Sequence, residues 1–203
     1  MTFATEQEAF WAGDFGNAYI ERNRYASAPT IAFLGRALRS AHGVRSIFEV
    51  GANIGNKIAA MQALFPAADV QAIEINAKAH AELVKIVPDA IHGSILDWEP
   101  DGRQYDLVYS TGVLIHLSPD HLPLVYDRMA TLSRRYVMMA EYYAPKPQEI
   151  PYRGERDKLF KRDFAGEFMD RTGFRLIDYG FVYHRDPVTA EDDITYFLME
   201  RPT

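Results

Sequence analysis

The 203-residue sequence contains no cysteine. This absence excludes a disulfide framework, a thiolate metal site and a cysteine nucleophile, and it fits a reducing cytoplasm. The sequence also has no basic, apolar leader after Met1 and no uninterrupted apolar run of about 18 residues, the length that would suggest a membrane span. We therefore expect a cytoplasmic protein that is neither exported nor embedded in a membrane.

Basic residues are outnumbered. Lys and Arg number 22 against 28 Asp and Glu, which gives a net charge of −6. A protein that binds a phosphate backbone needs a basic surface, so nucleic acid is not the expected partner. Hydrophobic residues make up 48% of the chain, which is enough to bury the core of one globular domain.

Short apolar runs alternate with helix-like spacing from residue 46 onward. This alternation predicts an α/β fold in which helices cover both faces of a mainly parallel sheet. The predicted strands lie near 46–50, 70–75, 89–93, 105–110, 135–142, 174–183 and 194–200, and the predicted helices near 55–65, 77–86, 119–133 and 162–172.

Two segments lie outside this alternation. Residues 1–42 are rich in aromatic side chains and are predicted to form a helical cap or lid, broken by Gly13, Gly16 and Pro29. Residues 43–203 are predicted to form the core of the single domain. An insertion at 143–163 within this core contains several prolines and is expected to face a substrate.

A glycine turn follows the first predicted strand. Glu49 ends the apolar run, and Gly51, Asn53 and Gly55 follow at intervals of two residues before the next helix. Glycine allows close approach of a ligand to the backbone, and a helix N-terminus offers unpaired N–H groups. Asn enters the left-handed region at lower cost than most other residues. The alternative is a strand-to-helix turn that binds nothing.

The spacing of this turn narrows the class of ligand. A dinucleotide fingerprint needs G-x-G-x-x-G and a phosphate loop needs G-x-x-x-x-G-K-[ST], and neither occurs at 51–58. The series G-x-N-x-G after an acid instead resembles the first motif of class I S-adenosylmethionine-dependent methyltransferases. The resemblance predicts that Glu49, Gly51, Asn53 and Gly55 contact that cofactor.

The ends of the second and third strands carry further candidates. Glu74 is placed to accept two hydrogen bonds from a ribose diol, with Ile75 against the adenine; the alternative for Glu74 is a solvated acid that caps the next helix. Ser94 and Ile95 follow the third strand. In many methyltransferases an acid occupies the position of Ser94, so base recognition here is expected to use backbone groups or Asp97.

The exit of the fourth strand brings Thr111 to the edge of the sheet where open α/β folds hold ligands, and we expect it beside the methionine end of the cofactor. His116 follows, and an imidazole suits the removal of a proton from a methyl acceptor. The alternative is a histidine that only fixes the loop. His184 and Glu141 are further candidates for the catalytic base.

A basic cluster spans residues 152–162 and has five basic side chains against two acids. Arginine suits a bidentate grip on carboxylate or phosphate, so we expect a small anionic substrate, although a solvated surface is the alternative. A metal at residues 191–193 is not expected, because no histidine or EF-hand spacing accompanies these acids. The predicted substrate-binding residues are Tyr142, Tyr152, Arg153, Arg156 and Lys158.

Nearly the whole chain resembles the methylases associated with pseudaminic acid biosynthesis. The resemblance implies a class I methyltransferase fold with a seven-stranded sheet, S-adenosylmethionine as cofactor, and an acidic nonulosonic sugar or its nucleotide-activated form as substrate. It also implies that Tyr19 and Arg22 close over the cofactor, with Arg22 meeting its carboxylate. The similar segments are 10–23, 49–55, 112–117, 140–145, 150–166, 179–186 and 192–197.

The sequence therefore predicts methyl transfer to a hydroxyl or amine of a small anionic molecule. One alternative is a cofactor-binding module without catalysis that serves a protein partner, since fold alone does not establish activity. Another is a nicotinamide-dependent reductase, because Tyr142 and Lys146 match Y-x-x-x-K. Pro145 and Pro147 argue against the helix that this motif requires.

Overall fold

A computed structural model describes residues 3–22, 27–189 and 192–202 of the chain. Asn23 of the first similar segment and Glu191 of the acidic loop lie outside these ranges. Within them, no helix combines the length and the apolar character needed to cross a bilayer. The described ranges also hold no group of three His, Cys, Asp or Glu side chains arranged for a metal.

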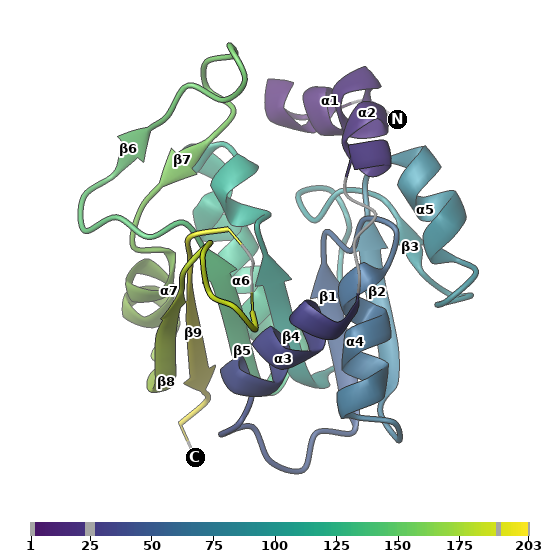
Figure 1. The fold of residues 1–203 in the computed structure, drawn as a ribbon, viewed down its shortest axis with the longest axis vertical. Helices are drawn as coiled ribbons and strands as arrows, with labels where there is room; N and C mark the ends of the chain where they lie inside the picture. Colours follow the sequence, from purple (N-terminus) through teal and green to yellow (C-terminus); the bar gives the residue numbers. More distant parts are fainter. Residues whose placement is uncertain (1–2, 23–26, 190–191, 203) are drawn as a thin grey trace.

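A seven-stranded sheet forms the centre of the molecule, in the order β3-β2-β1-β4-β5-β9-β8 (Figure 1). The first five strands along the chain pair in parallel, and β9 pairs antiparallel with both β5 and β8. The mostly parallel α/β fold is thus confirmed. The strands are β1 (Ser46–Val50), β2 (Asp69–Glu74), β3 (Ile91–His92), β4 (Tyr105–Thr111), β5 (Ser133–Glu141), β8 (Arg175–Val182) and β9 (Ile194–Glu200).

Helices cover both faces of this sheet, and each face has its own apolar core. On one face α3 and α4 pack together, and Phe33 and Met61 are buried with Ile47 of β1. On the other face α6 and α7 bury Met129 and Phe168 against the sheet. The helices are α1 (Glu6–Ala12), α2 (Asp14–Arg22), α3 (Ser27–Ala37), α4 (Asn56–Leu64), α5 (Ala77–Leu83), α6 (Leu122–Leu132) and α7 (Phe164–Thr172).

The N-terminal 42 residues divide into two parts, unlike the single cap that the sequence predicted. Helices α1 and α2 lie above the edge of the sheet, whereas α3 packs on its face (Figure 1). We call α1 and α2 the cap. The break at Gly13 is confirmed, but Gly16 lies within α2 and Pro29 within the first turn of α3. Proline is tolerated there because the first N–H groups of a helix have no intrahelical partner.

The insertion at 143–163 carries a small hairpin of β6 (Gln148–Glu149) and β7 (Phe160–Lys161). Its tip, residues 152–158, lies beside α1 (Figure 1), where Gln7 Nε2 donates to the Asp157 carbonyl at 2.9 Å. Residues 142–147 are not helical. The arrangement that Y-x-x-x-K requires on one helix face is therefore absent here, which removes the support for a reductase.

Candidate active site

The glycine turn has the conformation that its residue types predict. Gly51, Asn53 and Gly55 have φ values of 70°, 51° and 86°, all in the left-handed region. Side chains with a Cβ rarely adopt this region, and Asn tolerates it better than most. The alternation turns the chain sharply from β1 into α4, and the N–H groups of Gly51 and Ala52 both donate to the Ile73 carbonyl. The turn is therefore held against the end of β2.

Glu74, the last residue of β2, is buried beside this turn. Its two carboxylate oxygens accept from the backbone N–H groups of Asn53 and Asn76, both at 2.7 Å. A carboxylate has about four acceptor sites, so Glu74 retains acceptor capacity. Burial raises the pKa of Glu74, against the lowering effect of these backbone hydrogen bonds. Glu74 is therefore not the fully solvated acid of the alternative interpretation.

A single cavity joins the cap to the edge of the sheet. It runs from the glycine turn past the ends of β2 and β3 to the exit of β4, and α1 and α2 close it from above. Of the eleven predicted cofactor residues, nine line it: Tyr19, Glu49, Gly51, Asn53, Glu74, Ile75, Ser94, Ile95 and Thr111.

The polar wall of the cavity is acidic. Glu49 accepts a hydrogen bond from the Tyr109 hydroxyl at 2.6 Å, and Lys57 lies near enough to lower its pKa. Burial outweighs both effects and raises the pKa of Glu49 to about 7. A carboxylate that is forced toward its neutral form in a closed cavity would be relieved by a cationic ligand. The site is therefore electrostatically suited to a ligand that carries positive charge.

The turn after β3 contacts Glu8, a residue that the sequence did not single out. The Ser94 hydroxyl donates to a carboxylate oxygen of Glu8, which comes from α1 and is 3% exposed. The other oxygen of Glu8 accepts from the backbone N–H groups of Ala4 and Thr5 at 2.8 and 2.9 Å. The predicted alternative, Asp97, does not line the described cavity.

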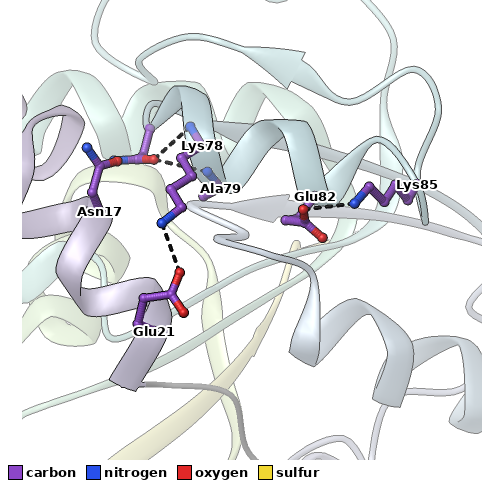
Figure 2. Close-up of polar contacts among 7 residues, drawn as sticks. Asn17, Glu21, Lys78, Ala79, Glu82 and Lys85 are labelled. Carbon is purple, nitrogen blue, oxygen red and sulfur yellow. Dashed lines mark hydrogen bonds and ion pairs between the residues drawn. The ribbon is translucent and has the colours of Figure 1, made fainter.

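Asn76, which follows β2 and precedes α5, forms hydrogen bonds with the cap. Its side-chain oxygen caps α5 by accepting from the N–H groups of Lys78 and Ala79, both at 3.0 Å. Its side-chain nitrogen donates to the Trp11 carbonyl and to Asn17, both at 3.1 Å. Figure 2 shows Asn17 beside this helix start and Lys78 reaching to Glu21 of α2 at 2.8 Å, while Glu82 and Lys85 pair farther along the chain.

His116 lies in the wall where the cap, the β4 exit and the insertion meet. Its Nδ1 is 2.6 Å from the Lys158 carbonyl, which can only accept, so Nδ1 carries the proton. Burial lowers the pKa of His116 to about 4, so the ring is neutral at pH 7 and Nε2 has a free lone pair. The rings of Trp11 and Tyr152 pack against it at 4.4 and 5.1 Å.

Glu141 lies beneath the turn that carries His116. It accepts from the Ser110 hydroxyl at 2.8 Å and from the N–H groups of Val113, Leu114 and Ile115 at 3.2–3.3 Å. Burial raises the pKa of Glu141 to about 7, although all four hydrogen bonds lower it. Glu141 does not line the described cavity.

Several predicted residues lie apart from the cavity. His184 is exposed and its Nδ1 is 2.9 Å from Asp193, and Arg22 packs over the Phe15 ring. Gly55 is the N-cap residue of α4 and does not line the described cavity. Tyr142 donates to Asp192 at 2.8 Å, and this hydrogen bond together with burial raises the Tyr142 pKa.

The basic cluster divides into two parts. Lys158 is buried and points to α1, where its ammonium lies 3.6 Å from Glu6 and over the Phe10 ring. Arg153 and Arg156 are exposed on the tip, and Arg153 lies 5.9 Å from the Tyr152 ring. None of the predicted substrate residues lines the described cavity, although Tyr152 contacts His116.

The sequence predicted a cap with Tyr19 at the cofactor, but it did not reveal the other residues that α1 and α2 contribute or the role of Asn76. A signal existed for Glu8, since Thr5-x-x-Glu8 matches a capping box, and the structure shows both of its hydrogen bonds. Nothing in the pattern linked Glu8 to Ser94. The missed residues that line the cavity include Gln7, Glu8, Trp11, Gly16, Ile20, Lys57 and Asn76.

Similarity to solved structures identifies the architecture. The chain has the class I methyltransferase fold. Magnesium protoporphyrin IX methyltransferase from Synechocystis PCC 6803, solved with bound S-adenosylmethionine, superposes with a TM-score of 0.67 at 14% identity, covering 100% of both chains. Burkholderia thailandensis 1,6-didemethyltoxoflavin-N1-methyltransferase superposes with a TM-score of 0.72 at 17% identity, covering 100% of this chain and 93% of that one.

A third similar structure is a methyltransferase from Leishmania major, with a TM-score of 0.72 at 13% identity, covering 97% of this chain and 82% of the other. Comparison with protein-family profiles and with curated protein sequences finds no match. The fold is thus shared with methyltransferases, and what the chain does has to be argued from its own site.

Proposed function

We propose that the protein is an S-adenosylmethionine-dependent methyltransferase that acts on an oxygen or nitrogen of a small molecule. The observation that carries the proposal is the junction of Gly51, Asn53 and Glu74. It combines a left-handed turn that lines the cavity with a buried carboxylate that has acceptor capacity left.

The residues present fit that cofactor. A Cβ at Gly51 would lie 2.6 Å from Val113 Cγ2, so this turn can approach the β4 exit as closely as it does only with glycine at position 51. Glu74 would hold the ribose hydroxyls, and Glu49 would face the positively charged methionine end. When bound, S-adenosylmethionine supplies a methyl group already activated by a sulfonium, so alignment of the acceptor can provide much of the acceleration.

His116 would orient the methyl acceptor. Because its Nδ1 proton is held by the Lys158 carbonyl, Nε2 can accept a hydrogen bond from a hydroxyl or amine and direct the lone pair of that nucleophile. The low pKa keeps this nitrogen unprotonated throughout the neutral range. Trp11 and Tyr152 exclude water from the same place.

Glu141 would serve as a positioning residue. Its hydrogen bonds to three consecutive N–H groups fix the turn 113–115, and this turn sets the direction of His116. A buried carboxylate that accepts four hydrogen bonds and does not reach the cavity has no access to a substrate. It acts through the shape of the turn.

We propose that the substrate is a small anion. Arg153 lies over the Tyr152 ring, and Tyr152 packs on His116, so Tyr152 connects Arg153 of the tip to the group that would orient the acceptor. Arginine grips carboxylate and phosphate through two parallel hydrogen bonds. Acidic nonulosonic sugars and their nucleotide-activated forms are the first compounds to test, because the sequence resembles methylases of that pathway.

Calorimetric titration with S-adenosylhomocysteine tests the cofactor. We expect saturable binding by the unaltered protein and a loss of roughly 10- to 100-fold in Glu74→Ala, the range of hydrogen bonds to a charged acceptor. Glu82→Ala, which removes a half-exposed acid of α5 paired with Lys85, serves as the matched control and should bind normally. No binding by the unaltered protein would refute the proposal.

Transfer of labelled methyl groups to a panel of acidic sugars, amino acids and peptides tests catalysis. An enzyme should label at least one class, and His116→Ala should slow turnover while leaving cofactor affinity within about twofold. Normal cofactor binding with no acceptor across the panel would instead favour the cofactor-binding module.

A further inference from the structure

The buried carboxylate of Glu8 is a feature that the proposed function does not yet use. Glu8 lines the cavity together with Ser94 and Ile95, at the end of β3. It reaches this place from α1, 86 residues away in the sequence, and receives the Ser94 hydroxyl hydrogen bond. An acid in such a place needs partners, because burying an unsatisfied charge is costly.

Helix capping accounts for only half of this carboxylate. Oε2 accepts from the N–H groups of Ala4 and Thr5, which completes the capping box at the start of α1. Oε1 accepts only from Ser94 among the described residues, and a carboxylate oxygen has about two acceptor sites. Oε1 therefore retains a lone pair in the wall of the cavity.

The neighbouring turn offers the complementary group. The Ser94 oxygen accepts from Leu96 N–H at 2.9 Å, which tightens the turn around Ile95. Ile95 N–H donates to no atom of the described residues. The cavity wall thus combines an acceptor, Oε1 of Glu8, with a donor, the N–H of Ile95.

The surrounding wall suits a flat, apolar ring. Ile73, Ile75 and Ile95 line the cavity on this side, and Gly93 adds no side chain. Glu74, the proposed ribose partner, precedes Ile75 directly, so this compartment is next to the compartment for the sugar. A nucleoside whose sugar is held by Glu74 would place its base among these residues.

We infer that Glu8, held by Ser94, is the residue that selects adenine, by accepting a hydrogen bond from its exocyclic amino group while Ile95 N–H donates to a ring nitrogen. The inference rests on the proposed function. Adenine presents a donor beside an acceptor, which matches this wall. Hypoxanthine presents a carbonyl oxygen and a ring N–H in the same places, so it would bring acceptor against acceptor and donor against donor.

This assignment links the base to the cap. Glu74, the ribose partner, belongs to the sheet, whereas Glu8, the acid that would bind the adenine amino group, belongs to α1. A bound adenine would therefore join α1 to the turn after β3 through Glu8, in addition to the Ser94 contact that exists without it.

Paired titrations with S-adenosylhomocysteine and S-inosylhomocysteine test the inference. The unaltered protein should prefer the adenosyl compound by at least tenfold. In Glu8→Ala, affinity for the adenosyl compound should fall by roughly 10- to 100-fold, as for loss of a charged acceptor, and affinity for the inosyl compound should stay the same or rise. The preference between the two ligands, and not affinity alone, is the readout.

Thr5→Ala is the matched control for folding of α1. It removes the other half of the capping box, since the Thr5 hydroxyl accepts from Glu8 N–H at 3.1 Å, and it leaves the Glu8 carboxylate in place. This variant should weaken both ligands equally or not at all. A second variant, Glu8→Ala with Ser94→Asp, moves the acid from the cap to the turn and should restore at least part of the preference.

The outcomes distinguish a failure of the Glu8 assignment from a failure of the proposed function. If Glu8→Ala weakens both ligands by the same factor, as a capping residue would, the assignment of Glu8 is overturned while the proposed function stands. If the unaltered protein binds neither compound, the proposed function fails first. A collapsed preference in Glu8→Ala with an intact preference in Thr5→Ala supports the inference.

Discussion

The two walls of the cavity are built by different means. The sheet wall, formed by the turns after β1, β2, β3 and β4, takes its shape from short stretches of consecutive residues such as 49–55. The cap wall, formed by α1 and α2, takes its position from contacts between distant residues: Asn76 with Trp11, Glu8 with Ser94, and Gln7 with the tip.

This difference has consequences for how each wall responds to change. A left-handed turn at the end of a buried strand cannot relax without disturbing the sheet, so strain placed there is retained. The cap contacts the rest of the protein through a few hydrogen bonds and aromatic contacts, so we expect that it can loosen while the sheet stays folded. We therefore expect substitutions in the sheet wall to cost most, those at the attachment of the cap less, and those on the exposed tip least.

The largest effect is expected from Gly51→Ala. The left-handed conformation costs a residue with a Cβ about 1–2 kcal/mol, and the collision with Val113 adds about 1–3 kcal/mol as overpacking. Gly43→Ala is the matched control, because Gly43 has nearly the same φ, 71°, with nothing within 4 Å of its added Cβ. Chemical denaturation and titration with S-adenosylhomocysteine should show a loss in Gly51→Ala that clearly exceeds that of Gly43→Ala. Equal losses would mean that close approach at Gly51 is unimportant.

Glu141→Gln tests how the stability of the β4 exit, where the sheet wall meets the cap, depends on pH. The folded-state pKa of Glu141 is raised to about 7 from an ordinary value of 4.5, so between these values the folded protein holds a proton that the unfolded chain has lost. Stability from this group is therefore full below pH 4.5 and is lost as pH rises through 7, by about 3 kcal/mol in total.

The measurement compares the free energy of unfolding of the two proteins between pH 4.5 and 8. Glu141→Gln lacks the titrating group, so the unaltered protein should lose stability relative to it as pH rises. His116 has the opposite dependence, because burial lowers its pKa to about 4, but it is present in both proteins and cancels in the difference. A difference that stays constant with pH would show that Glu141 is ionised in the folded protein throughout.

Asn76→Asp should loosen the cap selectively. The carboxylate retains an oxygen to cap α5, but it loses the N–H groups that reach Trp11 and Asn17 and faces their oxygens instead. Loss of such buried partners costs about 1–3 kcal/mol. Hydrogen exchange should accelerate in residues 6–22 and remain slow in β1 and β4. Equal acceleration in the sheet would contradict the independent loosening of the cap.

The smallest effect is expected from Arg153→Ala combined with Arg156→Ala. Both side chains are exposed on the tip, so stability should change by less than about 0.5 kcal/mol. Affinity for S-adenosylhomocysteine should stay within about twofold, while the KM for an anionic substrate should rise. An unchanged KM for the true substrate would assign these arginines to the solvated surface and remove the support for an anion.

Much of the fold follows from local pattern. The sequence predicted every strand of the seven-stranded sheet. The parallel strands were recognisable because strands buried on both faces need continuous apolar runs. Boundaries were less certain: β3 has only two paired residues, and α5 ends at Leu83, where the prediction had 86. Pro29 misled the prediction because a proline in the first turn continues a helix as well as it breaks one.

The candidate site likewise has residues that local pattern predicts and residues that only tertiary contacts place. The meeting of Glu49, Gly51, Asn53 and Glu74 at one cavity could be predicted, because each stands at or near the end of a strand and parallel strands bring their carboxyl ends to one edge. Their role toward a cofactor stays a prediction. The tip was harder to interpret. Its basic residues are adjacent in sequence, yet Lys158 points into the cap while Arg153 and Arg156 point to solvent.

The sequence by itself determined the order of strands and helices and the left-handed turn after β1, since both depend on residue types within a few positions of one another. Tertiary structure alone decided that Glu8 meets Ser94, that Glu141 supports the turn of His116, and that His116 is buried and neutral. Those outcomes depend on which distant surfaces exclude water from each side chain, and burial of that kind is a property of the packed chain as a whole.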